Sequence, residues 1–272
     1  TLTQVVRQQL TSGILENATS IRNELENFNQ KFPKIKQTHD VVSISGAELL
    51  EELENSHNKA GLEETIVITR SNKQANRYNE GIRRAILWKE SQISNGDHIM
   101  IVKNNYFWTE KNSEIDFIAN GDIAQVISIK NYENLYGFTF ANVRIKLPDY
   151  NNIEITAKVM IDTLTSESPS LSQEQNNQFY SQVIANYSDI KNKRTIFEKV
   201  KKNEYFNALQ IKFSYAITCH KAQGGQWKHV FIDHGYMPEE TTNKEFVRWL
   251  YTAFTRATEK VFLVNFKKEF FE

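Results

Sequence analysis

The sequence predicts an α/β fold in which a parallel sheet flanked by helices is interrupted by a small β-barrel and a helical insert. An apolar strand at Thr65–Thr69 is followed directly by an amphipathic helix at 72–88. Between residues 96 and 161 the hydrophobic period changes from helical to alternating. Residues 209–213 alternate again, and they are expected to lead the chain back into the parallel sheet.

The first 95 residues are expected to begin the parallel-sheet domain. Residues 11–29 show helical periodicity, with their apolar side chains on one face, and 47–57 form an acidic helix with a solvated face. The helix at 72–88 turns Ala75, Tyr78, Ile82 and Ile86 inward. The turn between strand and helix carries polar side chains at the place where open α/β sheets bind ligands, and a helix N-terminus favours phosphate.

Residues 96–161 predict the small barrel. Alternating strands at 98–103, 123–130, 137–147 and 153–161 are separated by turn signals at Asn120-Gly121 and Pro148-Asp149. Residues 162–207 then predict a helical and basic insert. It opens with a capping box at Ser172 and Gln175, continues with a helix, and ends in the basic stretch 191–202.

Residues 208–272 are expected to complete the parallel-sheet domain, with its last strand at 260–266. The stretch 215–223 is interpreted as a short helix closed by Gly224 and Gly225. Its polar tip suits phosphate oxygens, and the residues concerned are Thr218, His220, Lys221 and Gln223. An ordinary capped surface helix with one buried cysteine is an equal alternative on this stretch alone.

A second helix follows, because Phe246, Trp249, Leu250, Ala253 and Ala257 recur at helical spacing. Arg256 lies off this stripe. Its ordinary role would be to meet carbonyl groups at the end of the helix. Its functional role would be that of an arginine finger, which neutralises charge on a transferring phosphoryl group.

Four ordered segments carry a family resemblance. TCHKAQG at 218–224 and YTAFTRA at 251–257 resemble motifs V and VI of superfamily 1 helicases, in the branch that includes the RecD-like exodeoxyribonuclease V alpha subunits. TIVITRSNKQANRYNEGI at 65–82 and TQVVRQQL at 3–10 resemble two further motifs of that family, a strand-loop-helix and a glutamine-containing motif. The resemblance covers most of the chain except 107–120 and 161–207.

The resemblance implies the second RecA-like domain of a superfamily 1B DNA helicase, with an inserted barrel of the Src-homology-3 type. This region would be the C-terminal motor half of an ATP-dependent 5′-to-3′ translocase on single-stranded DNA. Arg256 and Arg7 would be its catalytic arginines, and nucleotide contacts would come from Gln8, Gln223, Gly224, Gln226 and Arg256. DNA contacts would come from Thr69, Ser71, Asn72, Lys103, Asn104, Asn105, Thr218, His220 and Lys221. The aromatic residues 106–108 would stack on bases or pack inside the barrel.

ATP and Mg²⁺ are the expected cofactors. The sequence contains no G-x-x-x-x-G-K-[ST] segment, so we expect a further N-terminal RecA-like domain to hold most of the nucleotide and the metal. The chain is therefore interpreted as part of a longer protein, inactive in hydrolysis by itself, and without a metal site of its own. Gln226 stands where many relatives place Glu beside the ribose, which leaves nucleotide preference open. The expected partners are single-stranded or partly duplex DNA, that N-terminal domain, and recombination or repair subunits.

Composition limits the classes of function. Lys plus Arg and Asp plus Glu each number 33, so any nucleic-acid contact must come from local patches. Cys219 is the only cysteine, which excludes internal disulfides and thiolate clusters and fits a reducing, cytoplasmic compartment. No apolar run is long enough to span a membrane.

Three alternatives remain from the sequence. A DNA-binding module that hands its strand to a separate motor would need the barrel and the basic insert but not Arg256. An accessory subunit with a degenerate motor half is a second alternative. A hydrolase built on Cys219 and His220 is disfavoured, because adjacent side chains on a helix point about 100° apart. The sequence shows no combination of carboxylates and lysine that would form the metal site of a nuclease.

Overall fold

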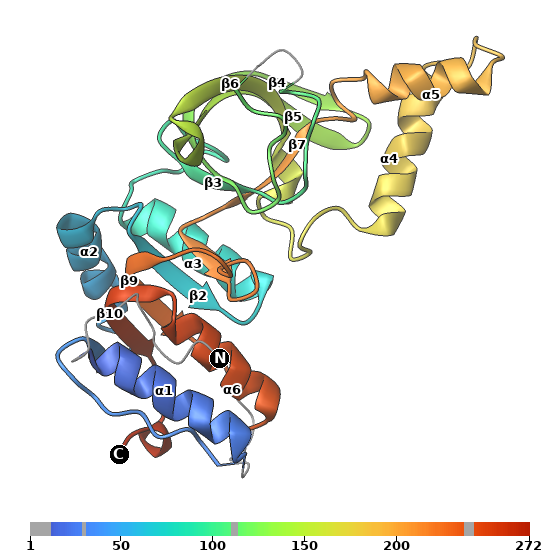
Figure 1. Cartoon of the computed structure of the whole chain (residues 1–272). Coiled ribbons are helices and arrows are strands. Elements are labelled where there is room, and N and C mark those ends of the chain that lie inside the picture. The colour runs from blue at the N-terminus through green and yellow to red at the C-terminus, as the bar shows by residue number, and fades with distance from the viewer. Residues whose placement is uncertain (1–11, 29–30, 110–113, 237–241) are drawn as a thin grey trace. The chain divides into compact units, whose positions relative to one another are not determined.

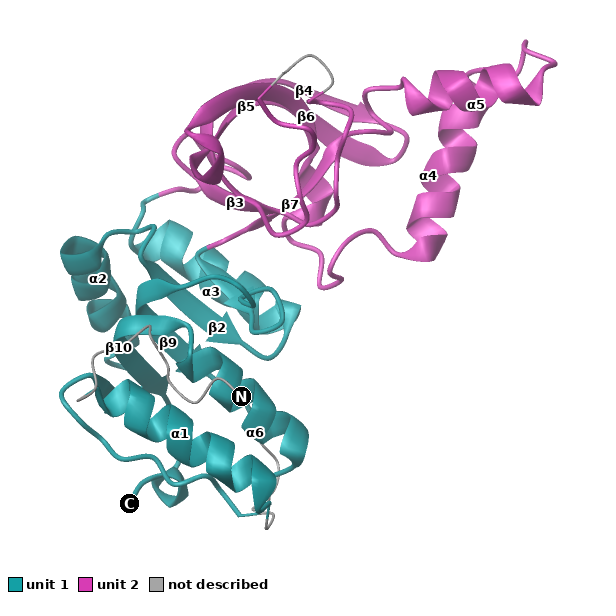
Figure 2. Ribbon diagram, in the orientation of Figure 1, with its two compact units in different colours: residues 1–88, 215–272 teal, residues 89–214 magenta. Residues whose placement is uncertain are grey.

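The computed structural model describes residues 12–28, 31–109, 114–236 and 242–272. The chain divides into two compact units, residues 1–88 with 215–272 and residues 89–214 (Figure 2). The sequence had suggested divisions after residues 95, 161 and 207. Arg7 and Gln8 lie outside the described residues.

A five-stranded parallel sheet forms the centre of unit 1 (Figure 1), in the order β1-β10-β9-β2-β8. Its strands are β1 (Val41–Ile44), β2 (Thr65–Thr69), β8 (Ala216–Thr218), β9 (Trp227–Asp233) and β10 (Ala257–Val264). Every residue of β2 is buried, as expected for a parallel strand covered on both faces. The apolar run HVFID at 229–233 also predicts an interior strand, and β9 confirms it.

Helices cover both faces of this sheet. The chain moves outward from β1 through β2 to β8 and then reverses towards β9 and β10, so right-handed crossovers place its helices on opposite faces. Helices α2 (Leu49–Ala60) and α3 (Asn72–Ala85) pack against β2, and α3 also packs against β8. Helices α1 (Gly13–Glu26) and α6 (Lys244–Phe254) pack on each other and on β10. The predicted α/β fold with a helix-flanked parallel sheet is confirmed.

A closed barrel forms the centre of unit 2. Its strands are β3 (His98–Ile101), β4 (Ile123–Leu135), β5 (Phe138–Leu147), β6 (Ile153–Met160) and β7 (Leu209–Phe213). Tyr136 and Gly137 connect β4 to β5 with positive φ angles of 54° and 75°, as a tight hairpin requires. The predicted barrel is therefore confirmed, with its first four strands close to their expected positions.

The fifth strand corrects a prediction. Residues 209–213 were expected to re-enter the parallel sheet, but β7 pairs antiparallel with β3 and parallel with β6. All five residues of β7 are buried, and a short strand buried on both faces has the same apolar pattern in a barrel as in a parallel sheet. The chain returns to unit 1 only at Tyr215.

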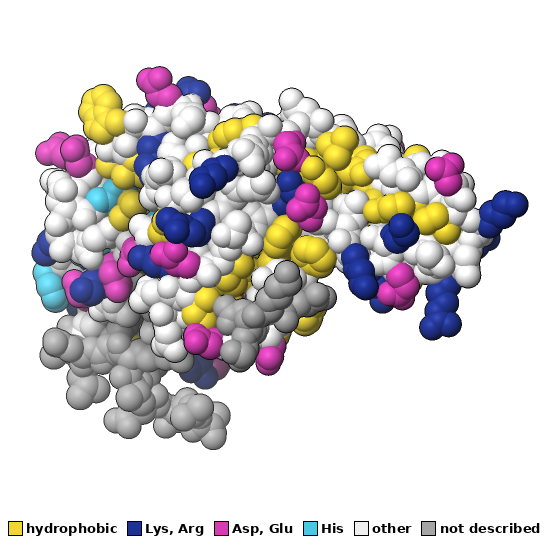
Figure 3. Space-filling view, turned by 90° about the horizontal axis from the view of Figure 1, so that it is seen from above, with side chains coloured by type: hydrophobic (Ala, Val, Ile, Leu, Met, Phe, Trp, Pro, Cys, Tyr) yellow, Lys and Arg dark blue, Asp and Glu magenta, His cyan; other side chains and the backbone are white. Residues whose placement is uncertain are grey.

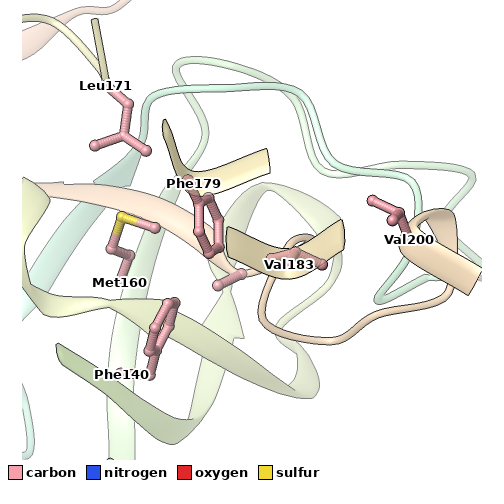
Figure 4. Close-up of a cluster of buried hydrophobic side chains, with 7 residues drawn as sticks. Phe140, Met160, Leu171, Phe179, Val183 and Val200 are labelled. Atoms are coloured by element: carbon pink, nitrogen blue, oxygen red, sulfur yellow. The ribbon is translucent and has the colours of Figure 1, made fainter. Parts of the chain in front are cut away.

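The helical insert lies between β6 and β7 and consists of α4 (Gln173–Ala185) and α5 (Lys193–Lys201). The predicted capping box at Ser172 and Gln175 is confirmed, with both of its reciprocal hydrogen bonds present. Phe179 and Val183 of α4 pack with Phe140 and Met160 of the barrel and with Val200 of α5 (Figure 4). This cluster fastens the insert to the barrel.

We predict that Phe179→Ala lowers the free energy of unfolding by about 3–5 kcal/mol, because it empties the centre of this cluster. Tyr180→Ala, at the exposed neighbouring position, is the matched control and should cost much less. Urea unfolding followed by circular dichroism measures both variants. Equal losses for the two would show that the cluster does not hold the insert.

Candidate functional site

Three strands of the parallel sheet end together at one edge. Thr69 of β2 pairs with Thr218 of β8 on one side and with Asp233 of β9 on the other. These three residues therefore form a row at the carboxyl ends of the strands. In open parallel sheets this edge is where ligands bind.

The turn from β2 into α3 begins at this row. Thr69 is fully buried, and its hydroxyl donates to the carbonyl oxygen of Ser71 at 3.1 Å. Ser71 caps α3, its hydroxyl oxygen accepting from the amide of Gln74 at 3.2 Å. Thr69 thus shapes the turn from inside, with its hydroxyl bonded within the turn. Ser71 is exposed and Asn72 half-buried, so these two present the polar surface of the turn.

Asp233 and Tyr78 form a polar pair at the same edge that sequence reasoning missed. The Tyr78 hydroxyl donates to one Asp233 oxygen, and the amide of Gly235 donates to the other at 2.7 Å. Burial and the bond to Asp233 raise the pKa of Tyr78. Tyr78 was expected only as an apolar contact of α3, and no local pattern signals a partner 155 residues away.

The predicted helix at 215–223 is wrong. Residues 216–218 form β8, and turns follow from Cys219. The edge of β2 supplies the reason: the amide of Val67 donates to the Tyr215 carbonyl at 3.0 Å, and the amide of Cys219 donates to the Thr69 carbonyl at 3.0 Å. The β-branched Ile217 and Thr218 also favour a strand.

The glycine pair ends these turns. Gly224 has a φ of 91°, in the left-handed region predicted for it. Gly225 lies against the indole of Trp227, and a Cβ atom built there would come within 2.3 Å of that ring. The backbone can follow this path only because position 225 has no side chain.

Arg256 lies between the end of α6 and the start of β10. Its guanidinium donates to the carbonyl oxygens of Thr252 and Gly225, each at 3.2 Å, and to the Thr255 hydroxyl at 3.1 Å. It therefore caps α6 and also contacts the glycine turn. Ala257, predicted on the helical stripe, instead begins β10, because a strand paired with Trp227 starts there.

The candidate residues occupy two edges of the sheet. Trp227 and Ala257 pair at the amino ends of β9 and β10, whereas Asp233 and Thr69 pair at the carboxyl ends. The length of β9 separates the two edges by about 20 Å, at roughly 3.3 Å per residue. Ser71, Asn72 and Thr218 thus lie at one edge, and Gly224, Gln226 and Arg256 at the other.

Residues 219–226 join these two edges. The Cys219 thiol donates to the Trp249 carbonyl on α6 at 3.4 Å, and the opposite end of the segment meets Arg256. His220, Gln223 and Gln226 are exposed and Lys221 is half-buried, where burial lowers its pKa. Burial raises the pKa of Cys219 to about 12, so the thiol stays protonated near neutral pH and is a poor nucleophile.

The remaining candidates belong to unit 2. Lys103 is exposed, and the Asn104 side chain accepts from the amide of Asn120 at 2.7 Å. Asn105 donates to the Asn207 carbonyl at 2.8 Å and accepts from the amide of Phe107, so it organises its own loop. Tyr106 is exposed and stacks on Phe117 at a centroid distance of 5.0 Å.

The described residues contain no group of three or more His, Cys, Asp or Glu residues placed to hold a metal ion. Among their helices, none has both the length and the apolar character needed to cross a bilayer.

The motifs of the parallel sheet lie in a part of the chain that is similar to a known protein family. Residues 213–264 match the UvrD-like helicase C-terminal domain. An uncharacterized protein of Acanthamoeba polyphaga mimivirus is 22% identical over 236 residues, covering 72% of this chain and 47% of that protein. Residues 213–264 are thus similar to the C-terminal domain of UvrD-like helicases.

Solved structures of Pif1 helicases also align with the chain. The Candida albicans enzyme gives a TM-score of 0.49 at 11% identity, covering 98% of this chain and 56% of that one. The Bacteroides enzyme in complex with ADP-AlF3 and ssDNA gives 0.45 at 12% identity, covering 100% and 53%. The chain spans about half the length of the proteins that it matches.

We predict that Gly225→Ala lowers the free energy of unfolding by about 1–3 kcal/mol, because the new methyl group displaces the Trp227 indole. Gly81→Ala is the matched control: it lies inside α3 with no atom within 4 Å of a Cβ, and it should stabilise by roughly 0.5–1 kcal/mol. Urea unfolding tests both. A wild-type midpoint for Gly225→Ala would exclude the close contact.

A pH dependence follows from His234, which is buried. Burial lowers its pKa below the ordinary 6.5; Asp233 and a hydrogen bond from the Gly235 backbone oppose this shift, and Arg70 and Lys267 add to it. His234 therefore binds a proton more readily in the unfolded chain than in the folded chain. The free energy of unfolding falls as the pH drops below about 6.5.

His234→Leu should flatten that dependence between roughly pH 7 and 5 in urea titrations at several pH values. His39→Gln, at a largely exposed histidine, is the control and should leave the slope unchanged. A His234→Leu variant that keeps the wild-type slope would contradict the assignment.

Proposed function

We propose that this chain is the C-terminal motor half of an ATP-dependent DNA helicase that translocates 5′ to 3′ on single-stranded DNA. The observation that carries the proposal is the contact between Arg256 and the Gly225 carbonyl. It joins the segment that resembles motif VI to the residue directly after the segment that resembles motif V, within the region that matches a helicase C-terminal domain.

The nucleotide would bind at the Arg256 edge of unit 1. ATP and Mg²⁺, when bound, supply the γ-phosphoryl group and the cation that neutralises much of its charge. The residues present fit such a group: a half-buried guanidinium lies beside a glycine turn, and Gln223 and Gln226 are exposed next to it. Arg256 would stabilise charge on the equatorial oxygens, and Arg7 and Gln8 would assist from the N-terminal segment.

The phosphate-loop side of the nucleotide would come from an N-terminal RecA-like domain. For that reason we expect this chain alone to be inactive in hydrolysis. Arg256 already has partners in the structure, so it would have to exchange at least one of its carbonyl contacts for a phosphate oxygen. Closure of the two RecA-like domains around ATP would drive this exchange.

DNA would bind at the carboxyl edge of the sheet and on the barrel loop. Ser71, Asn72 and Thr218 offer a helix N-terminus and polar groups, and His220 and Lys221 follow directly on the connecting segment. Lys103 and Asn104 would add backbone contacts from unit 2. Residues 219–226 reach from one edge to the other, so a change at Arg256 would alter the grip at Thr218.

The finer assignments rest on the motif resemblance. The motifs favour a RecD-like helicase of the exodeoxyribonuclease V alpha-subunit type. Such a helicase would work with recombination or repair subunits in the cytoplasm. A DNA-binding accessory module is the second candidate. The observation that favours it is the hydrogen bond from Arg256 to the Thr252 carbonyl, which shows that Arg256 also serves as a helix cap.

DNA-stimulated ATPase activity of the longer protein separates these candidates. Arg256→Ala should cut turnover by about 10³-fold or more if Arg256 is an arginine finger. Arg248→Ala, an exposed arginine on the same helix, is the matched control and should retain activity.

DNA binding and the unfolding midpoint are measured for each variant, so that loss of the helix cap is not mistaken for loss of catalysis. A folded Arg256→Ala protein with unchanged turnover would reject the motor proposal and favour the accessory module.

A further inference from the structure

The helical insert concentrates positive charge in a chain that is neutral overall. Residues 191–202 carry six basic side chains against the single acidic Glu198, and the basic residues are Lys191, Lys193, Arg194, Lys199, Lys201 and Lys202. All six are exposed. Across the described part of the chain, none of them forms an ion pair with an acidic side chain. Figure 3 shows Lys and Arg side chains standing out from the surface around α5.

Two of these positive charges destabilise the helix that carries them. Lys193 and Arg194 occupy the first turn of α5, where no acidic residue is present. The N-terminal end of a helix carries partial positive charge, so each cation there is unfavourable by roughly 0.3–1 kcal/mol. Folding alone does not explain this arrangement, whereas an external polyanion would compensate it.

The insert is nevertheless held firmly. Val200 is the only buried residue of α5, and a nine-residue helix is too short to be stable alone. The chain that follows α5 leads to Tyr205, whose hydroxyl donates a hydrogen bond to the carboxylate of Glu133 on β4. The same carboxylate lies 3.2 Å from the ammonium of Lys158, which is fully buried and lies 4.2 Å from the centroid of the Tyr205 ring. The basic helix is therefore fixed to the barrel through charged and aromatic contacts.

The neighbouring helix offers uncharged hydrogen-bonding groups. The solvent side of α4 carries the exposed amides of Gln173, Asn177, Gln178 and Gln182, with Glu174 as the only acidic residue of the helix. Tyr180 and Phe197 are exposed aromatic side chains on α4 and α5. Cations, amides and aromatic rings together are the groups that contact phosphates, sugars and bases.

We infer that α4 and α5 form a nucleic-acid contact surface that binds the phosphodiester backbone through Lys191, Lys193 and Arg194. This inference rests on the proposed function, since it assigns to the insert a second grip on the same DNA. The charge of the bound strand offsets the repulsion among the six cations and at the N-terminus of α5. Binding releases counterions, so affinity depends steeply on salt.

The test measures binding of this chain to fluorescent 20-nucleotide single strands, 20-base-pair duplexes and forks by anisotropy, over a series of salt concentrations. The variant is Lys191→Gln/Lys193→Gln/Arg194→Gln, which removes cations that do not support the helix. The control is Lys59→Gln/Lys267→Gln/Lys268→Gln, an equal charge change at exposed positions of unit 1.

The insert variant should bind about 10-fold more weakly or worse at roughly 0.1 M salt, and for duplex its log–log salt slope should fall by about 2–3, near 0.9 per lost phosphate contact. The control should change affinity less than about 3-fold. A larger loss on duplex or on single strands identifies which form of the backbone the insert faces, and either result supports the inference.

Equal losses in the insert variant and the control would overturn the inference, because only net charge would then matter. Unchanged binding by the insert variant would also overturn it, as would a wild-type chain that binds polyglutamate as tightly as the oligonucleotides. These results leave the ATPase test of Arg256 unaffected. The two tests thus distinguish a protein whose ATPase depends on Arg256 but whose insert does not bind nucleic acid from a protein in which the motor proposal itself is wrong.

Discussion

The parallel pairing of β2, β8 and β9 is the constraint on which the candidate site depends. Because β8 and β9 run in the same direction, the chain that leaves Thr218 at the carboxyl edge must return to the amino edge before Trp227. Most parallel connections use a long helix for this return. Here residues 219–226 make it in turns, so the chain passes from the carboxyl edge to the amino edge within eight residues.

The short return explains why glycine and arginine meet. The segment passes α6 at Cys219 and reaches the end of that helix at Gly225, where Arg256 donates to its carbonyl oxygen. The Trp227 indole fills the space that a side chain at Gly225 would need. Arg256 is thus both the cap of α6 and the link between the helix and the connection.

Much of the fold could be predicted from local patterns. The helix at 72–88, the β9 strand, four barrel strands and the capping box at Ser172 all have signals carried by neighbouring residues. The failures share a different cause. Residues 215–218 and 209–213 are short apolar stretches whose structure depends on which strand edge they meet, and that edge comes from distant sequence. The Tyr78 to Asp233 bond was missed for the same reason.

The two units differ in how far their polar and charged groups have partners within the chain. In the parallel sheet, polar groups at the edges are largely satisfied by their own chain, as Thr69 and Asp233 illustrate. In unit 2, the buried Lys158 of the barrel is compensated by Glu133 and Tyr205, whereas the described residues provide no acidic partner for the cations of α5, and Lys193 and Arg194 oppose the helix dipole. A chain with equal numbers of acidic and basic residues could have placed carboxylates there. Glu198 is the one acidic residue among 191–202, so this surface carries a net positive charge.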